Sequence, residues 1–238
     1  MRILAIDTSF GAGSVAAVDE DGMAERPLGP AGGHARVLTA ALAEVAAERG
    51  WGVGPTSLGD LGPGDVIAVV RGPGSFTGLR VGVAAAKALA WTTGASLVGV
   101  SGFDVLARRA ARLAGWPDEP IAIAYDAGRG DVFAAIATPT TGDWTIAPPC
   151  LVPLDSWLDS LPTGVRVTGP ALDALADRFT ARTDLARATP EAWHPLAADA
   201  AALARARAEA GEFDDPRTLL PDYLRQSYAE ERKPLPGG

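Results

Sequence analysis

The segment RGPGSFTGLRVGVAAAKALAW, residues 71–91, decides the fold, because an apolar strand (VIAVV, 66–70) runs through a glycine-rich turn directly into an alanine-rich helix. The N-terminus of such a helix attracts anions, since its first N–H groups lack partners inside the helix. Glycines allow tight backbone in the turn, and a hydroxyl side chain can cap the helix. The residues concerned are Gly72, Gly74, Gly78, Ser75 and Thr77.

This turn matches none of three common active-site motifs. A Walker loop ends in GK[ST], whereas Gly78 is followed by Leu79, and the dinucleotide fingerprint G-x-G-x-x-G has a last gap one residue shorter than the one found here. Ser75 lacks the flanking glycines of the hydrolase motif G-x-S-x-G. The turn therefore predicts an anion-friendly helix start without assigning a nucleotide or a nucleophile to it.

The strings GPGSFTGLR (72–80) and MRILAIDTS (1–9) resemble the TsaB (YeaZ) family, which belongs to bacterial tRNA threonylcarbamoyladenosine synthesis. The resemblance runs almost end to end, through GGHARVL (32–38), YDAGRGDVFAA (125–135) and PDYLRQSYAEERKPLP (221–236). Of these motifs GPGSFTGLR is highly specific, while each of the others would be weak alone.

Composition predicts a globular protein of a reducing compartment. The chain has 238 residues, of which 47% are apolar, and a single cysteine, Cys150, which excludes an intramolecular disulfide or a thiolate zinc cluster. We see no signal peptide and no apolar run near the roughly 20 residues of a membrane span. We therefore expect a soluble, cytoplasmic protein.

The charge balance argues against a main role in nucleic-acid binding. Lysine and arginine number 21 and aspartate and glutamate 29, so the net charge is −8, whereas phosphate contacts need clustered cations. The tail carries Arg225, Arg232 and Lys233, but Glu230 and Glu231 dilute this basic patch. We expect contact with tRNA only indirectly, through a partner.

The first half of the chain alternates strands and helices. We expect strands at 2–8, 14–19, 23–29, 65–70 and 96–100, and helices at 34–49, 77–92 and 103–114. The sequence GWPDEP (115–120) is a boundary. Beyond it we expect a smaller second lobe, with strands at 143–148 and 164–168 and helices near 154–160, 171–179 and 195–210.

Two segments share one pattern of buried strand, aspartate, small turn and apolar strand. They are IDTSFGAGSVAAV (6–18) and YDAGRGDVFAAI (125–136). Short motifs of this kind also arise by chance, but the family resemblance favours duplication. We predict an α/β fold with two RNase-H-like lobes of the actin-like/hexokinase-like class, the second abbreviated. The expected divisions are 1–101, 102–220 and a tail at 221–238.

In such a fold, both aspartates would point into the cleft between the lobes, where carboxylates can hold hydrated magnesium beside phosphates. The alternative is that each aspartate only caps its own turn. Arg129 could meet a phosphate or a partner's carboxylate. The candidate phosphate or nucleotide site, shared with partners, comprises Asp7, Gly72, Gly74, Ser75, Asp126 and Arg129. We expect no cofactor on the isolated chain, and ATP or ADP with magnesium only at the shared site.

Metal catalysis by this chain is not expected. Its histidines, His34 and His194, lie 160 positions apart and form no H-E-x-x-H pair. The resemblance implies that paired histidines of the related catalytic subunit bind the metal there. We interpret His34 as a cap or interface residue and assign no catalytic residue to this chain.

The two helices of the first lobe are the candidate partner interface. An apolar stripe on helix 34–49 follows i, i+3, i+4 spacing, and small residues recur every fourth position on helix 77–92. Such small residues also let a helix pack on its own sheet. The resemblance implies that these helices pair with the catalytic paralogue and with a second copy. The interface residues are His34, Val37, Leu38, Ala41, Leu42, Val45, Gly78, Gly82 and Ala86.

This interpretation makes Gly82→Leu a substitution that weakens association and leaves the fold largely intact. Three functions compete. The first is a non-catalytic scaffold that forms a heterodimer with the catalytic subunit TsaD and, with the ATPase TsaE, supports tRNA modification. The second is an autonomous ATPase or small-molecule kinase. The third, a peptidase, has no metal histidine pair or serine elbow in its favour.

Overall fold

The first sheet grows from the hairpin that carries Asp7. Strand β1 (Ile3–Asp7) pairs antiparallel with β2 (Ser14–Val18), which pairs with β3 (Met23–Pro27). On the other side of β1, strands β4 (Val66–Gly72) and β5 (Ser96–Ser101) run parallel to it. The computed structural model describes residues 1–30, 32–51 and 61–225, and the spatial order of this sheet is β3-β2-β1-β4-β5.

The second sheet repeats this order. Strands β6 (Ile121–Gly128), β7 (Asp131–Thr140) and β8 (Asp143–Ile146) form an antiparallel meander. Strands β10 (Arg166–Thr168) and β11 (Ala186–Arg187) continue in parallel beyond β6, so the order β8-β7-β6-β10-β11 matches the first sheet strand by strand. The actin-like/hexokinase-like duplication is thus confirmed. The short β9 (Cys150–Pro153), which pairs with β7, was not foreseen.

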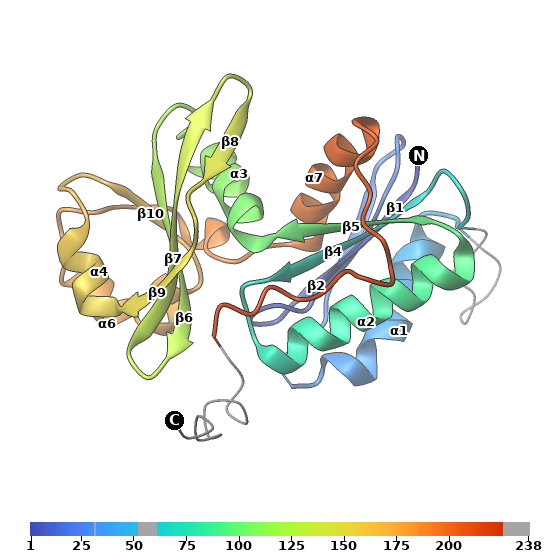
Figure 1. Ribbon diagram of the computed structural model, residues 1–238, viewed down its shortest axis with the longest axis horizontal. Helices are drawn as coiled ribbons and strands as arrows, with labels where there is room; N and C mark the ends of the chain where they lie inside the picture. Colours follow the sequence, from blue (N-terminus) through green and yellow to red (C-terminus); the bar gives the residue numbers. More distant parts are fainter. Residues whose placement is uncertain (31, 52–60, 226–238) are drawn as a thin grey trace, which may run out of the picture.

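Helices cover both faces of the first sheet (Figure 1). Strand β1 is buried on both sides, with Leu4 and Ile6 facing α1 (His34–Glu48) and α2 (Phe76–Thr93). Its alternate side chains, Ile3 and Ala5, face α7 (Ala197–Glu209). The continuous apolar run of this strand follows from having no solvent face.

Helix α7 corrects the expected division of the chain. It lies within the segment 102–220 that we assigned to the second lobe, yet its alanines pack in one cluster with Ile3 and Val66 of the first sheet. Helix α3 (Gly102–Ala114) lies between the lobes and contacts both sheets and α7. Periodicity predicted the helix near 195–210 but could not say which sheet it would cover.

The second lobe has shorter helices. These are α4 (Leu154–Ser160), α5 (Ala171–Ala174), α6 (Ala176–Thr180) and the 3₁₀ turn η1 (Pro190–Ala192). The single helix expected at 171–179 is broken at Leu175, whose backbone leaves the helical region at φ −125° and ψ 35°.

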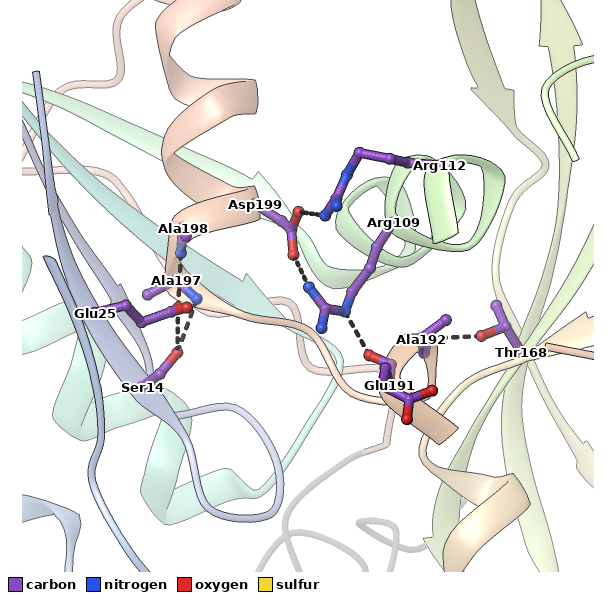
Figure 2. Close-up of polar contacts among 10 residues, drawn as sticks. All are labelled: Ser14, Glu25, Arg109, Arg112, Thr168, Glu191, Ala192, Ala197, Ala198 and Asp199. Carbon is purple, nitrogen blue, oxygen red and sulfur yellow. Dashed lines mark hydrogen bonds and ion pairs between the residues drawn. The ribbon is translucent and has the colours of Figure 1, made fainter. Parts of the chain in front are cut away.

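The first lobe caps the N-terminus of α7. No side chain of the residues just before the helix does so. Instead, the Ser14 hydroxyl on β2 accepts from the Ala197 amide at 2.8 Å, and the Glu25 carboxylate on β3 accepts from the Ala198 amide at 3.0 Å (Figure 2). Two of the unpaired N–H groups of the helix are thereby satisfied by residues about 170 or more positions away.

A second set of polar contacts holds the connection into α7. The Asp199 carboxylate on α7 binds both Arg109 and Arg112 of α3, the latter at 2.6 Å (Figure 2). On the side of the second lobe, the Thr168 hydroxyl donates to the Ala192 carbonyl at 2.7 Å. The chain between the lobes is therefore fixed at both of its ends.

After α7 the chain returns along α2. Residues 212–222 cross the first lobe, with the Asp214 amide bonded to the Leu97 carbonyl at 2.8 Å and Leu219 buried in the core. The expected tail, 221–238, is described only to Arg225, and the remainder lies outside the described residues. Within the described part of the chain, no helix has the length and apolarity needed to cross a bilayer.

Candidate functional site at the lobe junction

The glycine-rich turn closely contacts the end of β1. The Ser75 amide donates to the Ser9 carbonyl at 2.7 Å, and a Cβ on Gly74 would lie 2.2 Å from that same carbonyl oxygen. Ser75 caps α2 as expected, its hydroxyl accepting from the Gly78 amide at 3.4 Å. These glycines thus allow the turn to pack on this chain's own backbone. Their presence in the turn is therefore explained without a bound phosphate.

Asp7 is fully buried at the end of β1. Its side chain is 0% exposed, and Oδ1 accepts from the Ser9 amide at 2.8 Å and the Ser9 hydroxyl at 2.6 Å. Burial raises the pKa of Asp7 to about 6, although the Ser9 hydrogen bonds and the nearby His34 oppose the shift. Asp7 lines none of the four cavities described here, so the expectation that it points into an open cleft is wrong for this arrangement.

Tyr125 is the buried neighbour of Asp7 from the second lobe. Burial and, after it, the negative charge of Asp7 raise the pKa of this phenol well above its usual value. Among the described residues, neither Asp7 Oδ2 nor the Tyr125 hydroxyl has a hydrogen-bond partner. The ring packs edge-on against Phe10 and Phe103, with centroid distances of 6.0 and 5.3 Å. Asp7 therefore belongs to the closed interior of the junction.

Asp126 occupies the equivalent position in the second hairpin but is half-buried. Its carboxylate accepts from the Gly128 amide at 2.8 Å, so it caps the β6–β7 turn, the alternative that the sequence left open. Arg129, at the tip of the same turn, has a φ of 60° and is exposed. Of these two residues, only Asp126 lines the main cavity.

That cavity has a volume of about 790 Å³ and lies where the two lobes and the C-terminal segment meet. Its walls come from the start of α2, the β6–β7 turn and residues 222–225. They include Gly74, Ser75, Phe76, Arg80, Asp126, Phe133, Tyr223 and Arg225. Gly72 instead lines an adjoining cavity of about 360 Å³. The size and the aromatic lining are those of a small-molecule or partner site.

One wall is a stack of aromatic and arginine side chains. The rings of Phe76 and Tyr223 lie 5.0 Å apart, and the Arg80 guanidinium lies 3.7 Å from the centre of the Phe76 ring. Arg80 Nε also donates to the Tyr223 hydroxyl at 2.9 Å. Sequence reasoning missed this wall, because residues 222–225 carry no helical or strand periodicity to place them beside α2.

The expected interface residues lie mostly in this chain's own core. Val37 is 39% exposed, but the rest of the predicted set is buried, which corrects the assumption that the stripe faces outward. The buried residues are His34, Leu38, Ala41, Leu42, Val45, Gly78, Gly82 and Ala86. The reason is geometric, since the apolar side of α1 packs on the first sheet and the small residues of α2 face β1.

Gly82 shows the correction most clearly. A Cβ at this position would lie 2.3 Å from Thr8 Oγ1, and one on Gly78 would lie 2.1 Å from the Thr8 carbonyl oxygen. The repeated small residues therefore allow α2 to approach its own sheet, which is the alternative named above. His34 is also internal, its Nε2 lying 3.2 Å from the Gly29 carbonyl oxygen.

The side chains capable of metal binding are dispersed. In residues 1–30, 32–51 and 61–225, no group of three or more His, Cys, Asp or Glu side chains is placed to hold a metal ion. His194 lies 3.4 Å from Asp173 at the surface of the second lobe. Cys150, in β9, is exposed and donates weakly to the Ala134 carbonyl at 3.5 Å.

Comparison with known proteins gives the family. A model of the TsaD family (tRNA N6-adenosine threonylcarbamoyltransferase) matches residues 33–233. The tRNA threonylcarbamoyladenosine biosynthesis protein TsaB of Bacillus subtilis is 30% identical over 183 residues, covering 73% of this chain and 76% of that protein. Its Escherichia coli namesake is 36% identical over 136 residues, covering 57% and 54%.

A solved structure agrees with these relatives. YeaZ from Pseudomonas aeruginosa superposes with a TM-score of 0.74 at 26% identity, covering 94% of this chain and 99% of that one. The family model and the Bacillus relative both span most of the chain. The chain therefore belongs to the TsaB (YeaZ) family of tRNA threonylcarbamoyladenosine biosynthesis proteins.

Proposed function

We propose that this chain is a non-catalytic scaffold that pairs with the actin-like catalytic subunit TsaD. With the ATPase TsaE it supports threonylcarbamoyl transfer to the adenosine next to the tRNA anticodon. The observation that carries the proposal is the outer side of α2, which is apolar, poor in charge and not covered by the part of the chain that the structure describes. Contiguous apolar surface of this kind marks a protein interface.

We call this surface the α2 face. It consists of Val37 on α1, of Ala84, Ala88 and Trp91 on α2, and of Val81 on α2, which is half-buried and also packs against the core. The α2 members recur at i, i+3, i+7 and i+10, so they lie on one side of the helix. Trp91 is 72% exposed, and a large aromatic side chain is a frequent anchor of protein interfaces.

The two cations of α2 do not interrupt this face. Lys87 Nζ donates to the Leu219 carbonyl at 3.1 Å, and Arg80 binds Tyr223, so both turn toward the C-terminal segment. The α2 face thus lies on the two helices that the sequence indicated. Its residues on α2 differ from the expected Gly78, Gly82 and Ala86, which are buried. We propose that a second copy of this chain occupies the same face when TsaD is absent.

For an autonomous ATPase the geometry offers less support. Asp7, the carboxylate expected to hold magnesium, is buried and commits one oxygen to Ser9. Gly74, Ser75 and Asp126 do line the 790 Å³ cavity, and this supports a nucleotide or phosphate site there that needs a partner to complete it. We therefore propose that ATP or ADP with magnesium binds only at a site shared with partners. We also propose that the protein acts in the cytoplasm.

The interface is tested by adding a charge to the α2 face. Ala88→Glu should weaken the complex with TsaD about tenfold or more, equivalent to about 1.4 kcal/mol, and lower threonylcarbamoyladenosine formation in the reconstituted system. Ala202→Glu, at another exposed alanine, on α7, is the matched control. Calorimetric titration measures both variants. Wild-type affinity for Ala88→Glu would move the interface away from α2.

A further inference from the structure

Two polar ties join the lobes, beside the buried packing of Phe10 against Tyr125 at the junction. One is the connection around α3 and α7, held by Asp199 and its arginines. The other is the clamp segment, residues 219–225, which reaches the second lobe at the other end of the junction. In Figure 1 the connection lies high between the lobes, whereas the red segment approaches β6 low in the view. Rotation of the lobes about the α3–α7 connection therefore requires the clamp segment to release the second lobe.

The clamp segment is anchored firmly in the first lobe. Leu219 is 4% exposed and belongs to the core beneath α2. The Asp222 amide donates to the Arg71 carbonyl at 2.8 Å, and the Asp222 carboxylate lies 3.1 Å from the Arg71 guanidinium. This end of the segment cannot move without disturbing β4 and the core.

The hold on the second lobe is smaller. Arg225 donates to the Ala127 carbonyl at 2.9 Å and pairs with Asp131, so it grips both sides of the β6–β7 turn. Leu224 adds apolar contact with the core of the second lobe. Arg225 and Asp131 side chains are only 16% and 28% exposed, so water screens the pair less than a surface pair.

The same segment touches α2 beside the α2 face. Tyr223 binds Arg80 and stacks on Phe76, both in the first turns of that helix. Tyr223 and Arg225 lie two positions apart, and both line the 790 Å³ cavity. A displacement of α2 would therefore be transmitted to the β6–β7 turn through Tyr223 and Arg225. Because both residues line the cavity, its wall would move as well.

We propose that the clamp segment couples the α2 face to the β6–β7 turn, so that a partner docked on α2 sets how far the 790 Å³ cavity opens. The element with two states is the clamp itself, bound to the turn through Arg225 or released from it. The partner half of this inference rests on the proposed function. The mechanical half concerns this chain alone.

Hydrogen exchange in the isolated protein tests the mechanical half. Arg225→Ala should accelerate exchange of the backbone amides of residues 127–131 about fivefold or more, because the turn then opens without breaking the clamp. Arg217→Ala is the control, since Arg217 lies just before the clamp segment, is 77% exposed and contacts Asp215 instead of the second lobe. Equal exchange in the two variants would overturn the clamp.

A second variant tests the contact between the clamp segment and α2. Tyr223→Phe keeps the ring on Phe76 but removes the hydroxyl that accepts from Arg80. It should also accelerate exchange in residues 127–131, by about twofold to fivefold, and add little to Arg225→Ala in the double variant. If the two substitutions have fully additive effects on the exchange rate, the two contacts act independently and the coupling is wrong.

The partner half is read in the complex with TsaD. Binding should change exchange in residues 127–131 of the wild-type chain. Arg225→Ala should remove that change and, because coupling between two sites is reciprocal, should also alter the affinity for TsaD. A bound partner with no effect on the turn would overturn the coupling alone. Absence of binding would instead overturn the proposed function, and the isolated-protein experiments would still decide whether the clamp holds.

Discussion

The hydroxyl of Thr8 donates to the carbonyl oxygen of Gly78 over 2.7 Å, and this buried bond joins the end of β1 to the first turn of α2. The same Thr8 hydroxyl oxygen, Oγ1, lies 2.3 Å from where a Cβ on Gly82 would stand. Two successive turns of α2 therefore rest directly on Thr8. The helix can approach so closely only because the small residues recur every fourth position.

Gly82→Leu should destabilise the fold. A leucine must displace Thr8 or lift α2 from the sheet, and overpacking of this kind costs about 1–3 kcal/mol, occasionally more. Urea unfolding followed by circular dichroism measures the loss. Ala84→Leu, on the exposed side of α2, is the control and should leave the free energy of unfolding within about 0.5 kcal/mol of wild type. A stable Gly82→Leu with weakened association would restore the helix-crossing interpretation.

Asp7→Asn should remove a pH dependence of stability. Because the pKa of Asp7 in the folded protein, about 6, exceeds 3.8, the folded chain keeps this proton where the unfolded chain has lost it. The resulting stability is fully present below about pH 4 and is lost as pH rises through about 6. The advantage of Asp7→Asn over wild type should therefore grow by about 2 kcal/mol between pH 4 and pH 7.5.

This change is measured as the difference between two urea unfolding curves at each pH. Taking the difference cancels the other carboxylates, which contribute equally to both proteins. An advantage that stays constant across this range would show that Asp7 reaches water in the folded state, and the junction would then be open.

Glu25→Ala should loosen the N-terminus of α7. The carboxylate accepts from the Ala198 amide and from the Ser14 hydroxyl, so its removal leaves a helix amide without its partner. Loss of such a cap costs about 1 kcal/mol. Thermal unfolding against Glu20→Ala, whose side chain is 81% exposed, isolates the cap from the change of charge. Equal melting temperatures would remove the cap from the stability of the fold.

Asp199→Ala should cost more than a surface ion pair. Arg109, 11% exposed, would keep its charge but lose its carboxylate partner, retaining the hydrogen bond from Nε to the Glu191 carbonyl at 2.8 Å. We expect a loss of about 1–3 kcal/mol in unfolding free energy. The double variant Asp199→Ala with Arg109→Met should recover part of it, because the stranded charge is gone. No recovery would mean that packing, not charge, holds this connection.

The sequence predicted the elements well wherever one face or both faces of an element are buried. The apolar run of β1 and the i, i+3, i+4 stripe of α1 are direct consequences of the layers they form. The paired hairpins at Asp7 and Asp126 revealed the duplication, since each begins the same strand order. These signals are local and therefore readable.

Burial alone does not say what covers a residue. The stripe through Leu38 and Leu42 is equally suited to a partner helix and to the chain's own sheet, and only the three-dimensional arrangement distinguishes them. The placement of α7 and of residues 219–225 depends on contacts over long sequence distances, which periodicity does not encode. The candidate site was therefore found in part, at Gly74, Ser75 and Asp126, while Arg80 and Tyr223 were missed.

The return of α7 to the first sheet has a consequence for the order of assembly during synthesis. When the ribosome has made only residues 1–196, the side of the sheet that carries Ile3, Ala5 and Val66 has no α7 to cover it. A nascent chain in this state presents apolar sheet surface to the cell, where chaperones and aggregation compete for it. Closure of the first lobe must wait for α7 to emerge, so the amino-terminal half cannot mature ahead of the carboxy-terminal half.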